Sequence, residues 1–145
     1  MEQGQPARID FNPRFALARI GMGSALVELG RFGDAAFEFE RAVELEKGRR
    51  NTRAYLARSY ALGGRRAKAE KIFGELKGSA LRRTGSPWGV ALVAVSLGLN
   101  DEAMRWLDLG YQRRELSMGR LKVSPEFSGL RSDRRFVLLL EKMGL

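Results

Sequence analysis

The 145-residue sequence contains no cysteine and no histidine. Without cysteine it can form no disulfide, thiol nucleophile, zinc finger or iron–sulfur cluster. Without histidine it has no imidazole base, no usual proximal haem ligand and no Ser-His-Asp triad. No phosphate-binding loop, H-E-x-x-H motif or EF-hand loop replaces them. We therefore expect a protein that is not an enzyme and that has no cofactor and no metal site.

Long apolar runs are also missing. A membrane-spanning helix needs about 20 apolar residues, and the most apolar stretch, residues 90–95, is far shorter. The N-terminus lacks the basic stretch followed by an apolar one that marks a secretory signal. These features predict a cytoplasmic chain, or a soluble module of a larger protein.

What the sequence does have is a period of 34 residues. An internal repeat of this length is typical of helical solenoids. Five sets of positions recur at this spacing: Gly30, Gly64 and Gly98; Ala35, Ala69 and Ala103; Phe39, Phe73 and Leu107; Gly23, Ala57 and Ala91; Met22, Leu56 and Val90.

Each copy has the pattern of two helices joined by a tight turn. Apolar residues recur every three or four positions on both sides of the periodic glycine, as in amphipathic helices. A glycine between two helices fits a C-cap, where the left-handed conformation costs it little. Small residues at 23, 57 and 91 would let the paired helices approach closely, against the alanines at 35, 69 and 103.

The unit resembles the tetratricopeptide repeat (TPR), with matching small residues, alanines and aromatic residues, and Tyr60 as a further aromatic match. It departs from that pattern at Arg19, Arg53 and Pro87, where a large apolar residue is usual. The resemblance implies an all-α, TPR-like α-solenoid over residues 14–117, with repeats at about 16–49, 50–83 and 84–117. Residues 1–13 would be a remnant of a preceding repeat or an N-terminal extension. The first helix would then expose an apolar side, through which the chain could self-associate.

The C-terminal residues 118–145 break the period and predict a linker and a capping helix. Ser132 or Asp133 can N-cap that helix. The run from Pro125 to Phe136 resembles the tail that closes repeat arrays in bacterial proteins with cyclase, kinase or winged-helix regulator domains. The resemblance implies a module of a larger bacterial regulatory protein.

Positive charge is concentrated in the middle of the chain. The formal net charge is +9, and residues 47–83 contain twelve basic and two acidic residues. Three interpretations remain open: a solvated face, a docking surface for an acidic partner, or a nucleic-acid site. Aromatic residues are not interleaved with the arginines, as base stacking would require. The predicted basic patch consists of Arg49, Arg50, Arg53, Arg65, Arg66, Lys68 and Lys71.

The resemblance also implies a concave groove lined by the first helix of every repeat. A partner peptide with apolar anchors and an acidic residue near Arg58 would suit it, with Trp88 as the large aromatic contact. Alternatively, Trp88 simply packs in the core. We therefore predict a non-enzymatic protein–protein interaction module, with nucleic-acid binding as the alternative. The groove residues are Leu17, Ile20, Ser24, Val27, Asn51, Ala54, Arg58, Ala61, Gly85, Trp88, Leu92 and Val95.

Overall fold

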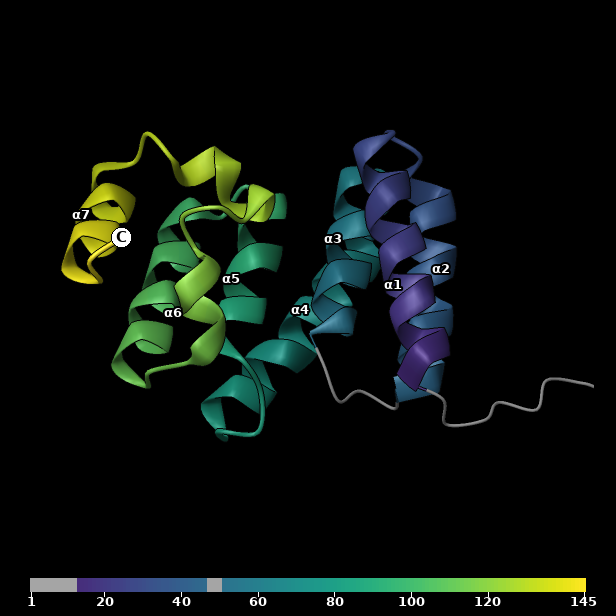
Figure 1. Cartoon of the computed structure of the whole chain (residues 1–145), viewed down its shortest axis with the longest axis horizontal. Coiled ribbons are helices and arrows are strands. Elements are labelled where there is room, and N and C mark those ends of the chain that lie inside the picture. The colour runs from purple at the N-terminus through teal and green to yellow at the C-terminus, as the bar shows by residue number, and fades with distance from the viewer. Residues whose placement is uncertain (1–12, 47–50) are drawn as a thin grey trace, which may run out of the picture.

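The computed structural model describes residues 13–46 and 51–145, and every regular element within them is helical (Figure 1). The predicted all-α class is confirmed. Residues 1–12, which make up most of the predicted N-terminal remnant, lie outside the described residues, as do Arg49 and Arg50. The elements are α1 (Pro13–Glu28), α2 (Phe32–Glu46), α3 (Thr52–Leu62), α4 (Arg66–Leu81), α5 (Pro87–Ser96), α6 (Asn100–Gln112), the 3₁₀ helices η1 (Leu116–Arg120) and η2 (Pro125–Leu130), and α7 (Arg134–Lys142).

The helices pack in chain order as a helical-repeat solenoid. Helix α1 packs on α2, α2 on α3, α3 on α4, and α5 on α3, α4 and α6. Figure 1 shows α1, α2 and α3 beside one another at one end, and α5 and α6 together towards the other. None of the helices in the two described ranges combines the length and apolar character that crossing a membrane requires.

The periodic glycines form the turns inside the helix pairs. Gly30, Gly64 and Gly98 have φ angles of 76°, 85° and 79°, in the left-handed region where a β-carbon is unfavourable. Each turn has the same hydrogen bonds; in the first, the amide of Gly30 donates to Val27 O and that of Arg31 to Leu26 O, both at 2.9 Å. This is the Schellman pattern that satisfies the last carbonyls of a helix. The predicted C-cap role of these glycines is confirmed.

Close helix packing also follows the prediction. A β-carbon added to Gly23 would lie 2.8 Å from the Phe39 ring, so only glycine lets α1 approach α2 this closely. The repeated alanines, Ala35, Ala69 and Ala103, are completely buried, and the side chain opposite Gly23 is Phe39. The 34-residue period therefore marks the contacts between the paired helices.

The C-terminal segment does more than the predicted linker and cap. Asp133 caps α7 by accepting a hydrogen bond from Arg135 N at 2.9 Å, which confirms one of the two predicted N-caps. Helix α7 packs on α6, where Arg135 pairs with Asp101 at 2.9 Å. The preceding residues, expected to be a linker, are instead part of the core. Their fully or almost fully buried side chains are Met118, Leu121, Phe127 and Leu130.

Candidate functional site

Three of the twelve predicted groove residues are buried. Trp88 and Leu92 have no exposed surface and Ala54 has 1%, so these three side chains cannot line an open groove. The prediction that Trp88 contacts a partner is therefore wrong. The alternative prediction, that Trp88 packs in the core, is confirmed.

The chain's own C-terminal segment fills this part of the groove. Phe127 of η2 packs edge-on against Trp88, with ring centroids 5.4 Å apart, and the Arg120 guanidinium lies 5.1 Å from the centre of the Trp88 ring. Gly129 lies against Val95, whose Cγ1 would be 3.5 Å from a β-carbon at that glycine. The repeat pattern gave no indication of this contact because the segment lies outside the period.

A row of aromatic rings connects the first helix pair to the C-terminal helix. Successive ring centroids are 5.4–6.5 Å apart, within the range in which aromatic pairs stabilise one another. The row therefore joins the C-terminal segment to the repeats through the concave side. Its members are Phe39, Tyr55, Trp88, Phe127 and Phe136.

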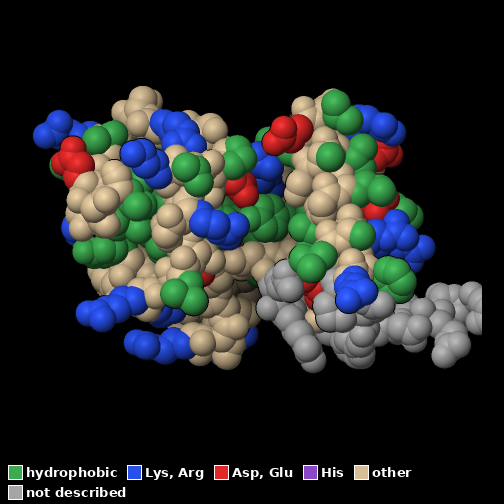
Figure 2. All heavy atoms as spheres, in the orientation of Figure 1, with side chains coloured by type: hydrophobic (Ala, Val, Ile, Leu, Met, Phe, Trp, Pro, Cys, Tyr) green, Lys and Arg blue, Asp and Glu red, His purple; other side chains and the backbone are tan. Residues whose placement is uncertain are grey.

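A hollow of about 420 Å³ remains open between α1, α3 and the start of η2, and we call it the α1–α3 hollow. Figure 2 shows a recess between the α1 side of the molecule and the C-terminal half, with acidic, basic and apolar side chains around it. Its lining is mainly apolar with three charged groups. The lining residues are Ser24, Val27, Glu28, Phe32, Phe39, Tyr55, Arg58, Leu62, Pro125 and Glu126.

The predicted groove residues are thus divided among several places. Ser24, Val27 and Arg58 line the hollow, as predicted for one surface. Leu17 is exposed and Ile20 is half-buried, and both lie outside it. The remaining positions do not reach the hollow either: Asn51 and Gly85 line a different cavity, and Ala61 and Val95 are half-buried against the core.

Arg58 already has acidic neighbours from its own chain. Burial lowers the pKa of its guanidinium, and the charges of Glu126, Tyr55 and Glu28 oppose that shift. Burial also raises the pKa of the Tyr55 hydroxyl, and the neighbouring Glu126 carboxylate raises it further. The acidic group that was expected to come from a partner is therefore supplied by α1 and η2.

Glu126 leaves an unused acceptor at the hollow. Its Oε1 atom is buried and has no hydrogen-bond partner among the described residues. A buried acceptor without a partner costs free energy, which a donor brought by a ligand would recover. With Glu28 and Glu126 against Arg58, the lining carries one net negative charge. The geometry suits an apolar group accompanied by a hydrogen-bond donor or a cation.

The described members of the predicted basic patch are spread along the α3–α4 pair. Arg53 lies at the start of α3 and pairs with Glu75 of α4. Arg65, Arg66 and Lys68 lie at the start of α4, and Lys71 lies one turn before Glu75. The Arg65 and Lys68 side chains lie 5.5 Å and 5.3 Å from the centre of the Tyr60 ring. Arg66 pairs with Glu70 at 3.0 Å. The basic residues are therefore distributed along one helix pair, and several of them already have acidic or aromatic neighbours.

Helix α1 exposes apolar side chains, as its predicted terminal position requires. Phe15, Met22 and Leu29 are seven residues apart and each is more than half exposed. Self-association through them stays a prediction.

The lining residues that the sequence did not predict lie both inside and outside the period. Phe39 is one of the repeated positions, whereas Tyr55 and Leu62 belong to α3 but not to the repeated positions. Glu126 belongs to a segment expected only to cap the array. The sequence offered one indication of Glu126, which is its place as an acidic residue within the Pro125–Phe136 motif. Across residues 13–46 and 51–145, no three acidic side chains converge where a metal ion could be held. Comparison with known protein families, curated proteins and solved structures found no match for this chain.

Proposed function

We propose that this chain is a non-enzymatic protein-interaction module, built on TPR-like repeats, that binds a partner peptide in the α1–α3 hollow. The observation that carries the proposal is an open, mainly apolar hollow whose lining includes Glu126, a carboxylate with one oxygen that has no hydrogen-bond partner among the described residues. Apolar pockets with a few directed polar groups are the usual form of recognition sites. Its volume of about 420 Å³ admits one large apolar side chain together with a neighbouring donor.

The partner in this proposal differs from the one that the sequence suggested. Arg58 is flanked by Glu28 and Glu126. An acidic partner residue that approached Arg58 would therefore be repelled by these two carboxylates. An apolar anchor next to a lysine or arginine complements the lining better, because it fills the hollow and gives Glu126 a donor. A larger bacterial regulatory protein belongs to the same proposal and rests on the C-terminal motif. A cytoplasmic location also belongs to it and rests on the N-terminal sequence, which does not resemble a secretory signal.

The described basic residues give little support to the alternative proposal of nucleic-acid binding. Arg53 and Arg66 are paired with glutamates, and the basic residues are spread along the α3–α4 pair. Phosphate-backbone recognition uses a continuous row of cations. We therefore retain the peptide as the proposed ligand.

Selection from a random peptide library tests the proposal. We expect enriched peptides that combine a large apolar residue with a nearby lysine or arginine. Ser24→Trp, which fills the hollow from an exposed position on α1, should weaken them about tenfold or more. Ala18→Trp, on an exposed part of the same helix outside the hollow, should change affinity by less than about twofold. Failure to enrich any peptide, or equal binding to both variants, would contradict the proposal.

A further inference from the structure

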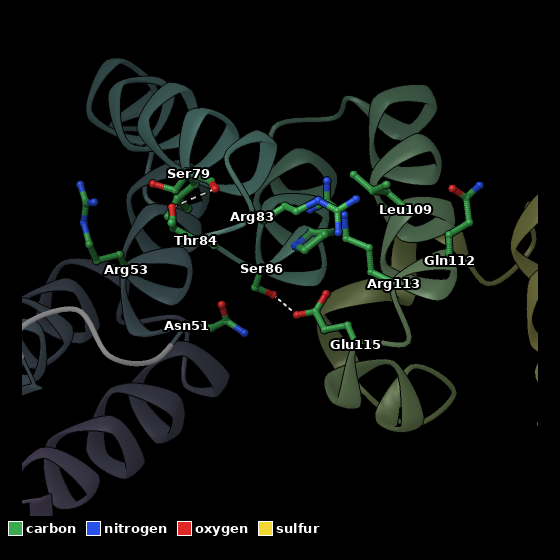
Figure 3. A pocket seen from close by; sticks show the side chains of 13 residues that line it. Asn51, Arg53, Ser79, Arg83, Thr84, Ser86, Leu109, Gln112, Arg113 and Glu115 are labelled. Carbon is green, nitrogen blue, oxygen red and sulfur yellow. Dashed lines mark hydrogen bonds between the residues drawn. The ribbon is translucent and has the colours of Figure 1, made fainter.

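A second and larger hollow lies where α3 and α5 begin and where α4 and α6 end (Figure 3). Its volume is about 930 Å³. Of its thirteen lining residues three are arginines, Arg53, Arg83 and Arg113, and one, Glu115, is acidic. We call it the arginine hollow. It is separate from the α1–α3 hollow and its charge has the opposite sign.

The single acid of the lining is already engaged. Glu115 Oε1 accepts a hydrogen bond from Trp88 N at 2.9 Å, and Oε2 accepts one from Ser86 Oγ, as the dashed line in Figure 3 shows. The carboxylate thus sits on the first turn of α5, where the helix dipole favours negative charge. Glu115 shows that a carboxylate fits the polar groups of this wall, and both of its oxygens already accept hydrogen bonds from α5 and its N-cap.

Arg113 has an unused donor. Its Nη1 donates to Ala80 O at 2.7 Å, at the end of α4, while its Nε is buried without a partner among the described residues. A buried guanidinium N–H without an acceptor is unfavourable, and an oxyanion is the acceptor that it binds most strongly. The Arg113 contact with Ala80 fixes the guanidinium at the wall of the hollow.

The backbone of Arg83 lies in a left-handed turn at the end of α4. Its φ angle is +63°, and the turn that ends α4 has hydrogen bonds from Arg83 N to Ala80 O at 3.1 Å and from Thr84 N to Ser79 O at 2.9 Å. In Figure 3 the Arg83 and Arg113 side chains both extend towards the centre of the view, and Arg53 stands apart to the left. Arg53 is paired with Glu75. Arg83 and Arg113 are therefore the cations best placed for a ligand.

The lining narrows the class of ligand. Guanidinium groups bind carboxylates and phosphates through paired hydrogen bonds. None of the thirteen lining residues is aromatic, so a nucleobase would find no stacking surface. The volume is near the upper end for ligand pockets and exceeds what one small ion would fill.

We propose that the arginine hollow binds an acidic peptide segment, whose carboxylates pair with Arg83 and Arg113. Ser79, Thr84 and Gln112 provide neutral hydrogen-bonding groups for its backbone. This site is independent of the proposed function, since it uses another part of the solenoid and a ligand of opposite charge.

Anisotropy of a labelled hexaglutamate peptide, titrated with the full chain, tests the assignment. Arg83→Gly should weaken binding about tenfold or more. The matched control is Arg114→Gly, which also removes one arginine from a left-handed turn (φ +55°) but lies outside the hollow. It should change affinity by less than about twofold. Both positions suit glycine, so neither variant should lose the fold.

Three outcomes would overturn the proposal: no hexaglutamate binding, equal binding of hexaglutamine, or equal loss of affinity in the two variants. Inorganic phosphate that binds through Arg83 while the peptide does not would also overturn it and would identify an ion site instead. Ser24→Trp fills only the α1–α3 hollow and should leave hexaglutamate binding unchanged, so failure of one proposal is distinguishable from failure of the other.

Discussion

Phe127 packs against Trp88 with their ring planes inclined at 64°, and neither side chain has any exposed surface. Phe127 belongs to η2, near the C-terminus, and Trp88 to α5, the first helix of the third pair. The contact fills the concave face of that pair with the chain's own segment. Of the predicted groove, Ser24, Val27 and Arg58 still line an open hollow, which lies between α1, α3 and the edge of η2.

Phe127→Ala should destabilise the fold strongly. Removing a buried phenyl ring leaves a cavity and costs about 3–5 kcal/mol. Chemical denaturation measures the loss, and Trp88 fluorescence should shift to the red as water reaches the indole. Trp88→Ala should show a similar loss of stability. Phe15→Ala, at a side chain that is 58% exposed, is the control and should cost less than about 1 kcal/mol. An unchanged midpoint for Phe127→Ala would show that η2 does not pack on α5.

Arg114→Gly should stabilise the chain. Arg114 has a φ of +55°, in a region that costs a residue with a β-carbon about 1–2 kcal/mol. Glycine removes that cost and loses part of the gain to its larger backbone entropy, so we expect the free energy of unfolding to rise by about 0.5–1 kcal/mol. Arg105→Gly, inside α6 on an exposed position, should instead lower it by about 1 kcal/mol. Destabilisation by both substitutions would argue against a left-handed Arg114.

Two neighbouring glycines of α1 should respond in opposite directions to alanine. Gly21 faces open space, and Gly21→Ala should stabilise the helix by up to about 1 kcal/mol. Gly23 faces the Phe39 ring, and Gly23→Ala should destabilise by about 1–3 kcal/mol because the ring must move. Thermal denaturation of the pair tests whether α1 packs on α2 through residue 23. Equal effects would contradict that contact.

Asp133 should make the stability depend on acidic pH. Its hydrogen bonds with Arg135 lower the pKa of the carboxyl below its ordinary value of 3.8. A group whose pKa is lower in the folded state stabilises the fold above its unfolded pKa, and that contribution disappears as pH falls through the folded pKa. Asp133→Asn retains a capping side chain but has no charge.

The difference in unfolding free energy between wild type and Asp133→Asn should therefore be constant near neutral pH and shrink below about pH 4. Asp108→Asn, at an exposed position of α6, provides the comparison. A wild-type advantage that persists unchanged into strong acid would show that the Asp133 charge contributes nothing to the cap.

The repeated part of the fold could be predicted from the sequence because its constraints are local and periodic. The sequence shows a left-handed glycine at 30, 64 and 98 and a buried alanine at 35, 69 and 103 as residue types at a fixed spacing. The helix cap at Asp133 could be predicted for the same reason, since capping depends on residues next to one another in the chain.

The candidate site was predictable only in part, because it depends on contacts between distant segments. Ser24, Val27 and Arg58 follow from the repeat register. The burial of Trp88 depends on Phe127, 39 residues further along the chain, and nothing in the local pattern pairs them. The charge at the hollow was misjudged for the same reason, since Glu126 reaches Arg58 only after the C-terminal segment has folded back.

Binding of a partner in the α1–α3 hollow can be followed by the amide chemical shifts of the ¹⁵N-labelled chain during titration with a library-selected peptide. We expect the largest changes at Ser24, Val27, Arg58 and Glu126. Changes confined to the exposed α1 side chains Phe15 and Met22, with the hollow unaffected, would contradict it.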